Sequence, residues 1–270
     1  VTGFALRVQP PITHTRNSDT KSMKFAHSLT RPQKLFVVCT AIFLTALVVA
    51  EATASKFFTA FTLPFSISIL GVEFNEVIMT AGVLAFPITF IITDLINEYF
   101  GKPGIRFVTY IGMGMIIFEF GLLQLAMAVP TSDISPVPGE AFNAVFGATG
   151  RIIIGSLTAY VIGQLVDIYL FHWLRNRTGG KHLWLRATGS TFGSQFIDTF
   201  VVLTVAFFGQ LSFAEIIAIT LFNYGYKFVI VILITPVIYG AHWVMDRYLG
   251  QETANELIHA AETGHSESPI

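Results

Sequence analysis

Polar side chains recur at helical spacing inside one apolar stretch of this sequence, residues 191–211. Ser194 and Asp198 are four positions apart, and Thr191 and Gln195 fall at the same interval. Residues three or four apart lie on one face of a helix, so hydroxyls, an amide and a carboxylate share a stripe. Such a stripe could hold a small polar molecule, with the carboxylate accepting hydrogen bonds from paired N–H donors.

Three other apolar stretches carry similar stripes. The residues that could do chemistry there are Asp94 in 77–97 with Glu98 directly after it, Gln164 and Asp167 in 151–173, and Tyr224 and Lys227 in 214–241. An ionised group near the bilayer centre costs about 2.5–3.5 kcal/mol, so these residues have to pair with one another or face water. Four polar faces therefore predict a shared central cavity. Glu51 and Glu119 are also expected within the membrane, but no spacing assigns them a role.

The composition indicates a polytopic membrane protein. Of 270 residues, 53% are hydrophobic and 12% are charged, whereas about 25% are charged in a typical soluble domain. This excludes a disordered chain, a disulfide scaffold and an ordinary soluble enzyme. The net charge of −1 gives no general attraction to nucleic acid. The histidines lack metal-ligand spacing and no phosphate-binding loop is present, so we expect no metal, no cofactor and no ATP hydrolysis by this chain.

Six stretches have the roughly 20 apolar residues that a helix needs to cross a bilayer. They are 35–55, 77–97, 105–129, 151–173, 191–211 and 214–241. The segment 57–71 is apolar but short and contains Pro64, so we expect a re-entrant or interfacial connector there, with a seventh span as the alternative. The predicted fold is an all-α integral membrane protein with six transmembrane helices.

The basic residues predict the orientation. Nearly all lysines and arginines fall in the two tails and in the loops after the second and fourth spans, whereas Lys56 and Arg151 lie on the other side. By the positive-inside rule both termini face the cytoplasm. The chain then divides into a basic cytoplasmic tail (1–34), a transmembrane domain (35–241) and a cytoplasmic C-terminal tail (242–270).

Four segments resemble the queuosine precursor transporter family, also called the VUT family. They are FPITFIITDLINEYFGK at 86–102, RIIIGSLTAYVIGQLVDIYLF at 151–171, STFGSQFIDTF at 190–200 and YGYKFVIVILITPVIYG at 224–240. The resemblance implies a bacterial inner-membrane importer of 7-deazaguanine bases, the cyano and aminomethyl precursors of queuosine. It also implies a likeness to the six-helix substrate-binding subunits of energy-coupling-factor vitamin transporters. Eight residues fall on the family's polar positions: Asp94, Gln164, Asp167, Ser190, Thr191, Asp198, Tyr224 and Lys227.

The chemistry of such a base suits these residues. A deazaguanine presents N1–H and N2–H₂ as adjacent donors, with O6 as an acceptor beside them, and one carboxylate can accept from both donors. We expect Asp198 to bind this edge, with Asp167 as the alternative. Gln195, Gln164 or Lys227 would complete the set, and Tyr224 would cover the ring. Ser194 and Thr191 lie on the same stripe as Asp198.

The driving force is open at this point. Asp94 and Glu98 could carry a coupling proton or act in gating, and facilitated diffusion with trapping inside the cell is equally allowed. A substrate-binding subunit energised by a separate ATPase complex, or a transporter of another purine-like base, is the alternative function, and a homo-oligomer is not excluded. The carboxylates are spread over several spans without a paired nucleophile and base, so an enzyme is not expected.

Overall fold

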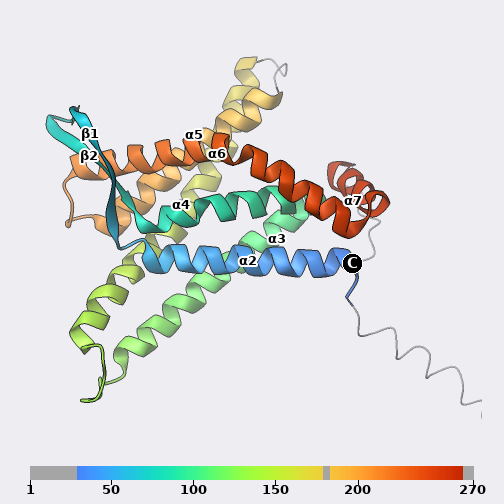
Figure 1. Ribbon diagram of the computed structural model, residues 1–270. Helices are drawn as coiled ribbons and strands as arrows, with labels where there is room; N and C mark the ends of the chain where they lie inside the picture. Colours follow the sequence, from blue (N-terminus) through green and yellow to red (C-terminus); the bar gives the residue numbers. More distant parts are fainter. Residues whose placement is uncertain (1–28, 179–182, 264–270) are drawn as a thin grey trace, which may run out of the picture.

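The computed structural model describes residues 29–178 and 183–263 and is mostly helical (Figure 1). Its elements, in chain order, are α2 (Arg31–Thr53), β1 (Phe57–Ile69), β2 (Val72–Thr80), the 3₁₀ helix η1 (Ala81–Ala85), α3 (Phe86–Ala128), α4 (Gly139–Thr178), α5 (Leu183–Phe207), α6 (Phe213–Leu249) and α7 (Gln251–Thr263). Two helix starts are set by local sequence. Thr30 and Gln33 form a capping box at α2, and Ser212 and Glu215 form another at α6, each satisfying backbone N–H groups that the helix leaves unpaired.

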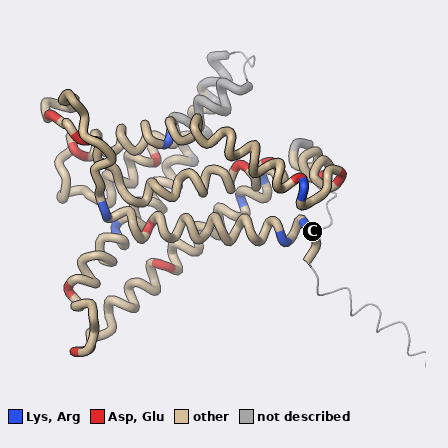
Figure 2. Tube along the Cα trace, in the orientation of Figure 1, with Lys and Arg blue, Asp and Glu red and all other residues tan. Residues whose placement is uncertain are grey.

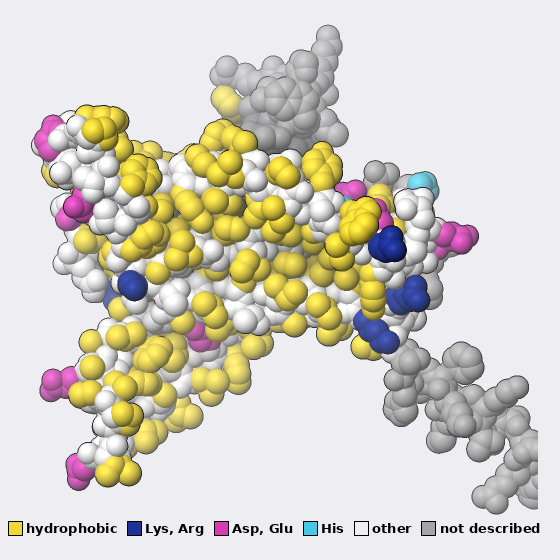
Figure 3. Space-filling view, viewed as in Figure 1, with side chains coloured by type: hydrophobic (Ala, Val, Ile, Leu, Met, Phe, Trp, Pro, Cys, Tyr) yellow, Lys and Arg dark blue, Asp and Glu magenta, His cyan; other side chains and the backbone are white. Residues whose placement is uncertain are grey.

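Within the described residues, four helices are long and apolar enough to cross a membrane. They are Arg31–Thr53, Ala81–Ala128, Gly139–Gly163 and Phe213–Leu249. The predicted spans 77–97 and 105–129 both fall largely in this second helix, and 191–211 falls mainly on α5, whose described apolar part, Gly193–Phe207, is shorter. The count of six crossings stays a prediction. Hydrophobic side chains cover much of the bundle surface (Figure 3), as expected of helices that face lipid.

The long helix α3 is bent at Gly101. This residue has φ 64° and ψ −170°, which is outside the helical region and is accessible almost only to glycine. From this point the turquoise and green halves of α3 diverge in Figure 1. Helix α7 packs against the bend: a Cβ atom added to Gly101 would lie 3.2 Å from Cα, Cβ and the carbonyl oxygen of Ala261. The bend falls in the gap between the stretches 77–97 and 105–129, which are predicted to be the second and third spans.

The connector after α2 is a β-hairpin, so the all-α prediction is wrong at this point. Strands β1 and β2 pair antiparallel, and Leu70 and Gly71, both with positive φ, form the turn between them. Pro64 lies where the pairing register shifts between Thr62 and Ile67, which is where a sheet tolerates a residue without an N–H donor. The helix predicted from residue 77 consequently begins later, after β2 ends.

The close packing of η1 on α2 gives a first testable prediction. A Cβ atom on Gly82 would lie 2.6 Å from the carbonyl oxygen of Ala50 and 2.9 Å from Cβ of Ala54. Because the carbonyl belongs to helix backbone, Gly82→Ala should destabilise the protein by about 1–3 kcal/mol. Thermal unfolding in detergent measures this, and Gly114→Ala, where nothing lies within 4 Å of the added atom, is the control. Equal unfolding temperatures for the two variants would contradict the packing.

Candidate functional site

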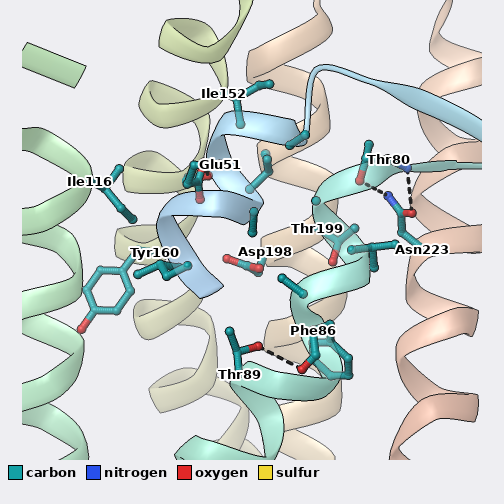
Figure 4. Close-up of a pocket in the computed structure, with 18 of the residues that line it drawn as sticks. Glu51, Thr80, Phe86, Thr89, Ile116, Ile152, Tyr160, Asp198, Thr199 and Asn223 are labelled. Carbon is teal, nitrogen blue, oxygen red and sulfur yellow. Dashed lines mark hydrogen bonds between the residues drawn. The ribbon is translucent and has the colours of Figure 1, made fainter. Parts of the chain in front are cut away.

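A cavity of about 350 Å³ lies inside the bundle, bounded by α2, β2, η1, α3, α4, α5 and α6 (Figure 4). Pockets for small molecules are commonly about 300–1,000 Å³ and mostly apolar, with a few polar groups that fix orientation. The apolar wall includes Phe43, Phe86, Ile116, Ile152 and Phe207. The polar side chains on the wall are Glu51, Thr80, Thr89, Thr109, Ser156, Tyr160, Asp198, Thr199, Asn223 and Lys227. The cavity therefore has the size and the mixed lining of a small-molecule site.

Asp198 of α5 and Lys227 of α6 both line this cavity. Figure 4 shows the Asp198 carboxylate in the middle of the lining residues, and within the described part of the chain it has no hydrogen-bond partner. Lys227 Nζ donates to Thr199 Oγ1 at 3.1 Å and lies 5.5 Å from the centroid of the Phe86 ring. No ion pair within 4 Å joins Asp198 to Lys227. The carboxylate is thus left available to a molecule that enters the cavity.

Glu51, near the end of α2, brings a second carboxylate to the cavity wall. Its side chain is buried, with 8% of the residue exposed. Ser156 Oγ of α4 donates to Glu51 Oε2 at 2.8 Å. One hydroxyl therefore orients this carboxylate, and the contact joins α2 to α4 at the cavity.

Asn223 of α6 ties the end of β2 to the cavity wall. The Thr80 backbone N–H donates to Asn223 Oδ1 at 3.3 Å, and Asn223 Nδ2 donates to Thr80 Oγ1 at 3.4 Å (Figure 4). Both residues are buried, so their polar groups satisfy one another. This pair positions η1, which follows Thr80 directly and lines the cavity.

The other predicted site residues are placed differently. Gln195 is exposed, and Ser194 is buried, but neither is on the cavity wall. The Tyr224 ring packs edge-on against Phe196, with 5.5 Å between the ring centroids, and is also not on the wall. The side chains of Gln164, Asp167 and Thr191 lie outside what the structure describes.

Asp94 and Glu98 of α3 do not line the cavity. Asp94 Oδ2 lies 3.3 Å from Nε2 of His242, whose Nδ1 is 3.4 Å from the Tyr99 hydroxyl. That hydroxyl donates to Asp246 Oδ1 at 2.7 Å, so a polar chain links α3 to the far part of α6. Glu98 is exposed. The role of these two acids in coupling or gating stays a prediction.

Glu51, Ser156 and Asn223 are cavity residues that our predicted site did not include. Glu51 was expected within the membrane, and Asn223 lies four positions before Lys227, on the same face of that helix. The contact of Glu51 with Ser156 joins residues 105 positions apart, so no spacing within one helix could reveal it. The sequence signal that could identify these residues is the free-energy cost of placing a polar side chain in lipid. That cost indicates that a partner is needed but does not say which residue the partner is.

An apolar helical bundle that encloses a cavity lined by acids, hydroxyls and an ammonium group defines a multi-pass membrane protein with an internal polar site. The family model described as "Putative vitamin uptake transporter" matches residues 80–241, which run from the end of β2 into α6. The chain belongs to this family, the queuosine precursor transporter (VUT) family.

Three curated proteins share this similarity. A "Probable queuosine precursor transporter" of Bacillus subtilis (strain 168) is 31% identical over 173 residues, which are 63% of this chain and 74% of the relative. The protein of the same name from Haemophilus influenzae (strain ATCC 51907 / DSM 11121 / KW20 / Rd) is 34% identical over 130 residues, 48% of this chain and 52% of the relative.

The third relative, the "Queuosine precursor transporter" of Escherichia coli (strain K12), is 32% identical over 152 residues, 52% of this chain and 58% of the relative. The chain thus matches between about half and three quarters of the length of these relatives. No solved structure matches the chain. All three relatives are named as transporters, so this family is one of transporters and not of enzymes.

Proposed function

We propose that this protein imports a queuosine precursor, 7-cyano-7-deazaguanine or its 7-aminomethyl relative, across a bacterial inner membrane. The observation that carries the proposal is the Asp198 carboxylate, which faces the cavity without a hydrogen-bond partner in the described part of the chain. The names of the three relatives support the same substrate class. The cavity, at about 350 Å³, supplies the space for one flat bicyclic base.

Asp198 and Lys227 match the two kinds of group on the guanine-like edge. The carboxylate accepts from N1–H and N2–H₂ together, and such charge-assisted bidentate pairs are stronger than neutral hydrogen bonds. The Lys227 ammonium group, which has donors beyond the one used on Thr199, donates to O6. Phe86 lies on the cavity wall and covers one face of the ring. Asp167 and Gln164 stay as alternative partners for the same edge.

We also propose that both termini face the cytoplasm. Arg31 and Lys34 lie at the start of α2, Lys102 and Arg106 flank the bend of α3, and Arg247 lies near the end of α6. In Figure 2 several of the blue Lys and Arg positions are gathered toward the end of the bundle where α2 begins. An excess of lysine and arginine at one end is typical of the cytoplasmic side.

Binding of a purine panel to the purified protein tests the proposed substrate. Bases that carry the 2-amino group should bind, whereas hypoxanthine, which lacks it, should bind roughly ten- to a hundredfold more weakly. The reason is that one hydrogen bond to a buried charged group is lost, at about 1.5–3 kcal/mol. Adenine, which presents a different pattern of donors, should also bind weakly. Equal affinity for all four bases, or no binding of the two deazaguanines, would contradict the proposal.

A further inference from the structure

The acidic groups on the cavity wall outnumber the basic groups. Among the described residues, Glu51 and Asp198 contribute two carboxylates, whereas Lys227 contributes the one ammonium group. The remaining polar side chains on the wall are hydroxyls and an amide. A neutral base that uses both Asp198 and Lys227 therefore leaves the charge of Glu51 without a counter-charge.

Two described carboxyl groups act electrostatically on Glu51. Glu119 reaches it from α3 and Asp198 from α5, and both are carboxyl groups. On α4 its partner is the neutral hydroxyl of Ser156, and Tyr160, also on α4, is neutral as well. On α6, Lys227 is held by Thr199 and acts on Asp198. Among the described residues no lysine or arginine nitrogen lies within 4 Å of Glu51.

A carboxylate buried without a positive partner is costly in a membrane protein. Removing an unpaired charge from water costs several kcal/mol, which one hydroxyl contact does not offset. The side chain is nevertheless open to the cavity, which it lines. A positive partner, which is absent among the described residues, can therefore arrive through the cavity.

We propose that Glu51 is the residue at which one positive charge enters the cavity together with the substrate; this rests on the function proposed above. With the neutral 7-cyano base, the charge is a proton that the carboxylate takes from water on one side of the membrane and returns to water on the other. With the 7-aminomethyl base, the ammonium group of the ligand itself supplies the charge. In both cases the carboxylate of Glu51 is neutralised and Asp198 stays free to bind the guanine-like edge.

This assignment differs from the prediction of Asp94 and Glu98 as coupling residues. Asp94 already has His242 as a partner at 3.3 Å, and its side chain is 44% exposed. Glu98 is exposed and neither residue lines the cavity. Only an ionisable group on the cavity wall can link its own protonation directly to binding of the substrate, and Glu51 is such a group.

The test compares wild type with Glu51→Gln in liposomes and in detergent. Both bases are used as probes, for equilibrium binding and for uptake driven by an inward proton gradient. Glu51→Gln should bind the cyano base with an affinity close to that of wild type, while its gradient-driven uptake of this base falls at least about tenfold. The same variant should bind the aminomethyl base at least about tenfold more weakly. Glu51→Asp, which keeps the acid, should retain part of both properties.

Two controls keep the result interpretable. Glu140→Gln removes one carboxylate from the first turn of α4, outside the cavity, and should leave binding and uptake unchanged. Ser156→Ala removes the hydroxyl that donates to Glu51. It should shift the pH profile of uptake without the loss seen for Glu51→Gln, and this readout applies even where Glu51→Gln fails to fold.

The outcomes separate the two sources of charge. A defect of Glu51→Gln confined to gradient-driven uptake of the cyano base identifies a proton, and a defect confined to binding of the aminomethyl base identifies the ligand. Wild-type behaviour of Glu51→Gln with both bases overturns the proposal for Glu51 while leaving the proposed function intact. Failure of the wild-type protein to bind either base overturns the proposed function instead.

Discussion

Asp198→Asn should abolish uptake of a 7-deazaguanine base while leaving membrane insertion intact. The asparagine amide can accept one hydrogen bond but turns an N–H₂ donor toward the donor edge of the base, so the bidentate pair becomes one contact and one repulsion. Loss of one hydrogen bond to a charged group, the weakening of the other to a neutral one and the new donor–donor repulsion together cost about 3–4 kcal/mol, or a factor of roughly 100–1,000 in affinity. Binding to purified protein and uptake in liposomes measure the effect.

The matched control for this prediction is Asp133→Asn. Asp133 is an exposed residue between α3 and α4, so the same chemical change there should leave uptake close to that of wild type. Surface expression and the gel-filtration profile show whether each variant inserts and folds. Unchanged uptake by correctly inserted Asp198→Asn would remove this residue from the site and direct attention to Asp167.

Gly101→Ala should be the most damaging substitution in α3. An alanine would have to adopt φ 64° and ψ −170°, a conformation that costs about 1–3 kcal/mol in a residue with a Cβ atom. That atom would also meet Ala261 at 3.2 Å. We expect a clearly lower unfolding temperature in detergent and reduced uptake at physiological temperature.

Two comparisons separate the causes of this effect. Gly121→Ala lies in the same helix with nothing within 4 Å of the added atom, and it should be neutral or slightly stabilising, because alanine favours helix. Deleting residues 251–270 from Gly101→Ala removes the contact with Ala261 but not the backbone strain. If Gly101→Ala lowers the unfolding temperature less in the shortened protein than in the full-length protein, the difference is due to the contact with Ala261. An unfolding temperature of full-length Gly101→Ala equal to that of wild type would contradict both causes.

Much of the helical framework was predictable because apolar length is a direct requirement of the bilayer. The gap between the stretches 77–97 and 105–129 coincides with the bend at Gly101, where glycine and the following Pro103 interrupt the apolar run. The β-hairpin was missed because a short apolar run rich in aromatic and β-branched residues reads equally as a strand or as part of a helix. The segment forms a strand because β1 pairs with β2, and such pairing cannot be read from either segment alone.

The candidate site was predictable in part for a similar reason. The cost of a charge in lipid pointed to Asp198 and Lys227, and the structure places both on the cavity wall. Gln195 belongs to the same helical stripe as Asp198 but is exposed, since a stripe is wider than the face that meets a cavity. The contact of Ser156 with Glu51 depends on how α2 and α4 pack, which spacing within one helix cannot express.

Helix α7 packs on the bend of α3 and so connects the C-terminal part of the chain to the helix bundle. Ala254 of α7 is fully buried, and Leu257 and Ile258 pack against the same core cluster as Leu95 and Val108 of α3. If the two arms of α3 rock about Gly101 during a transport cycle, this last helix has to move with them. A fluorescent probe attached to the exposed side of α7 would then report each turnover from outside the cavity, without touching the substrate's path.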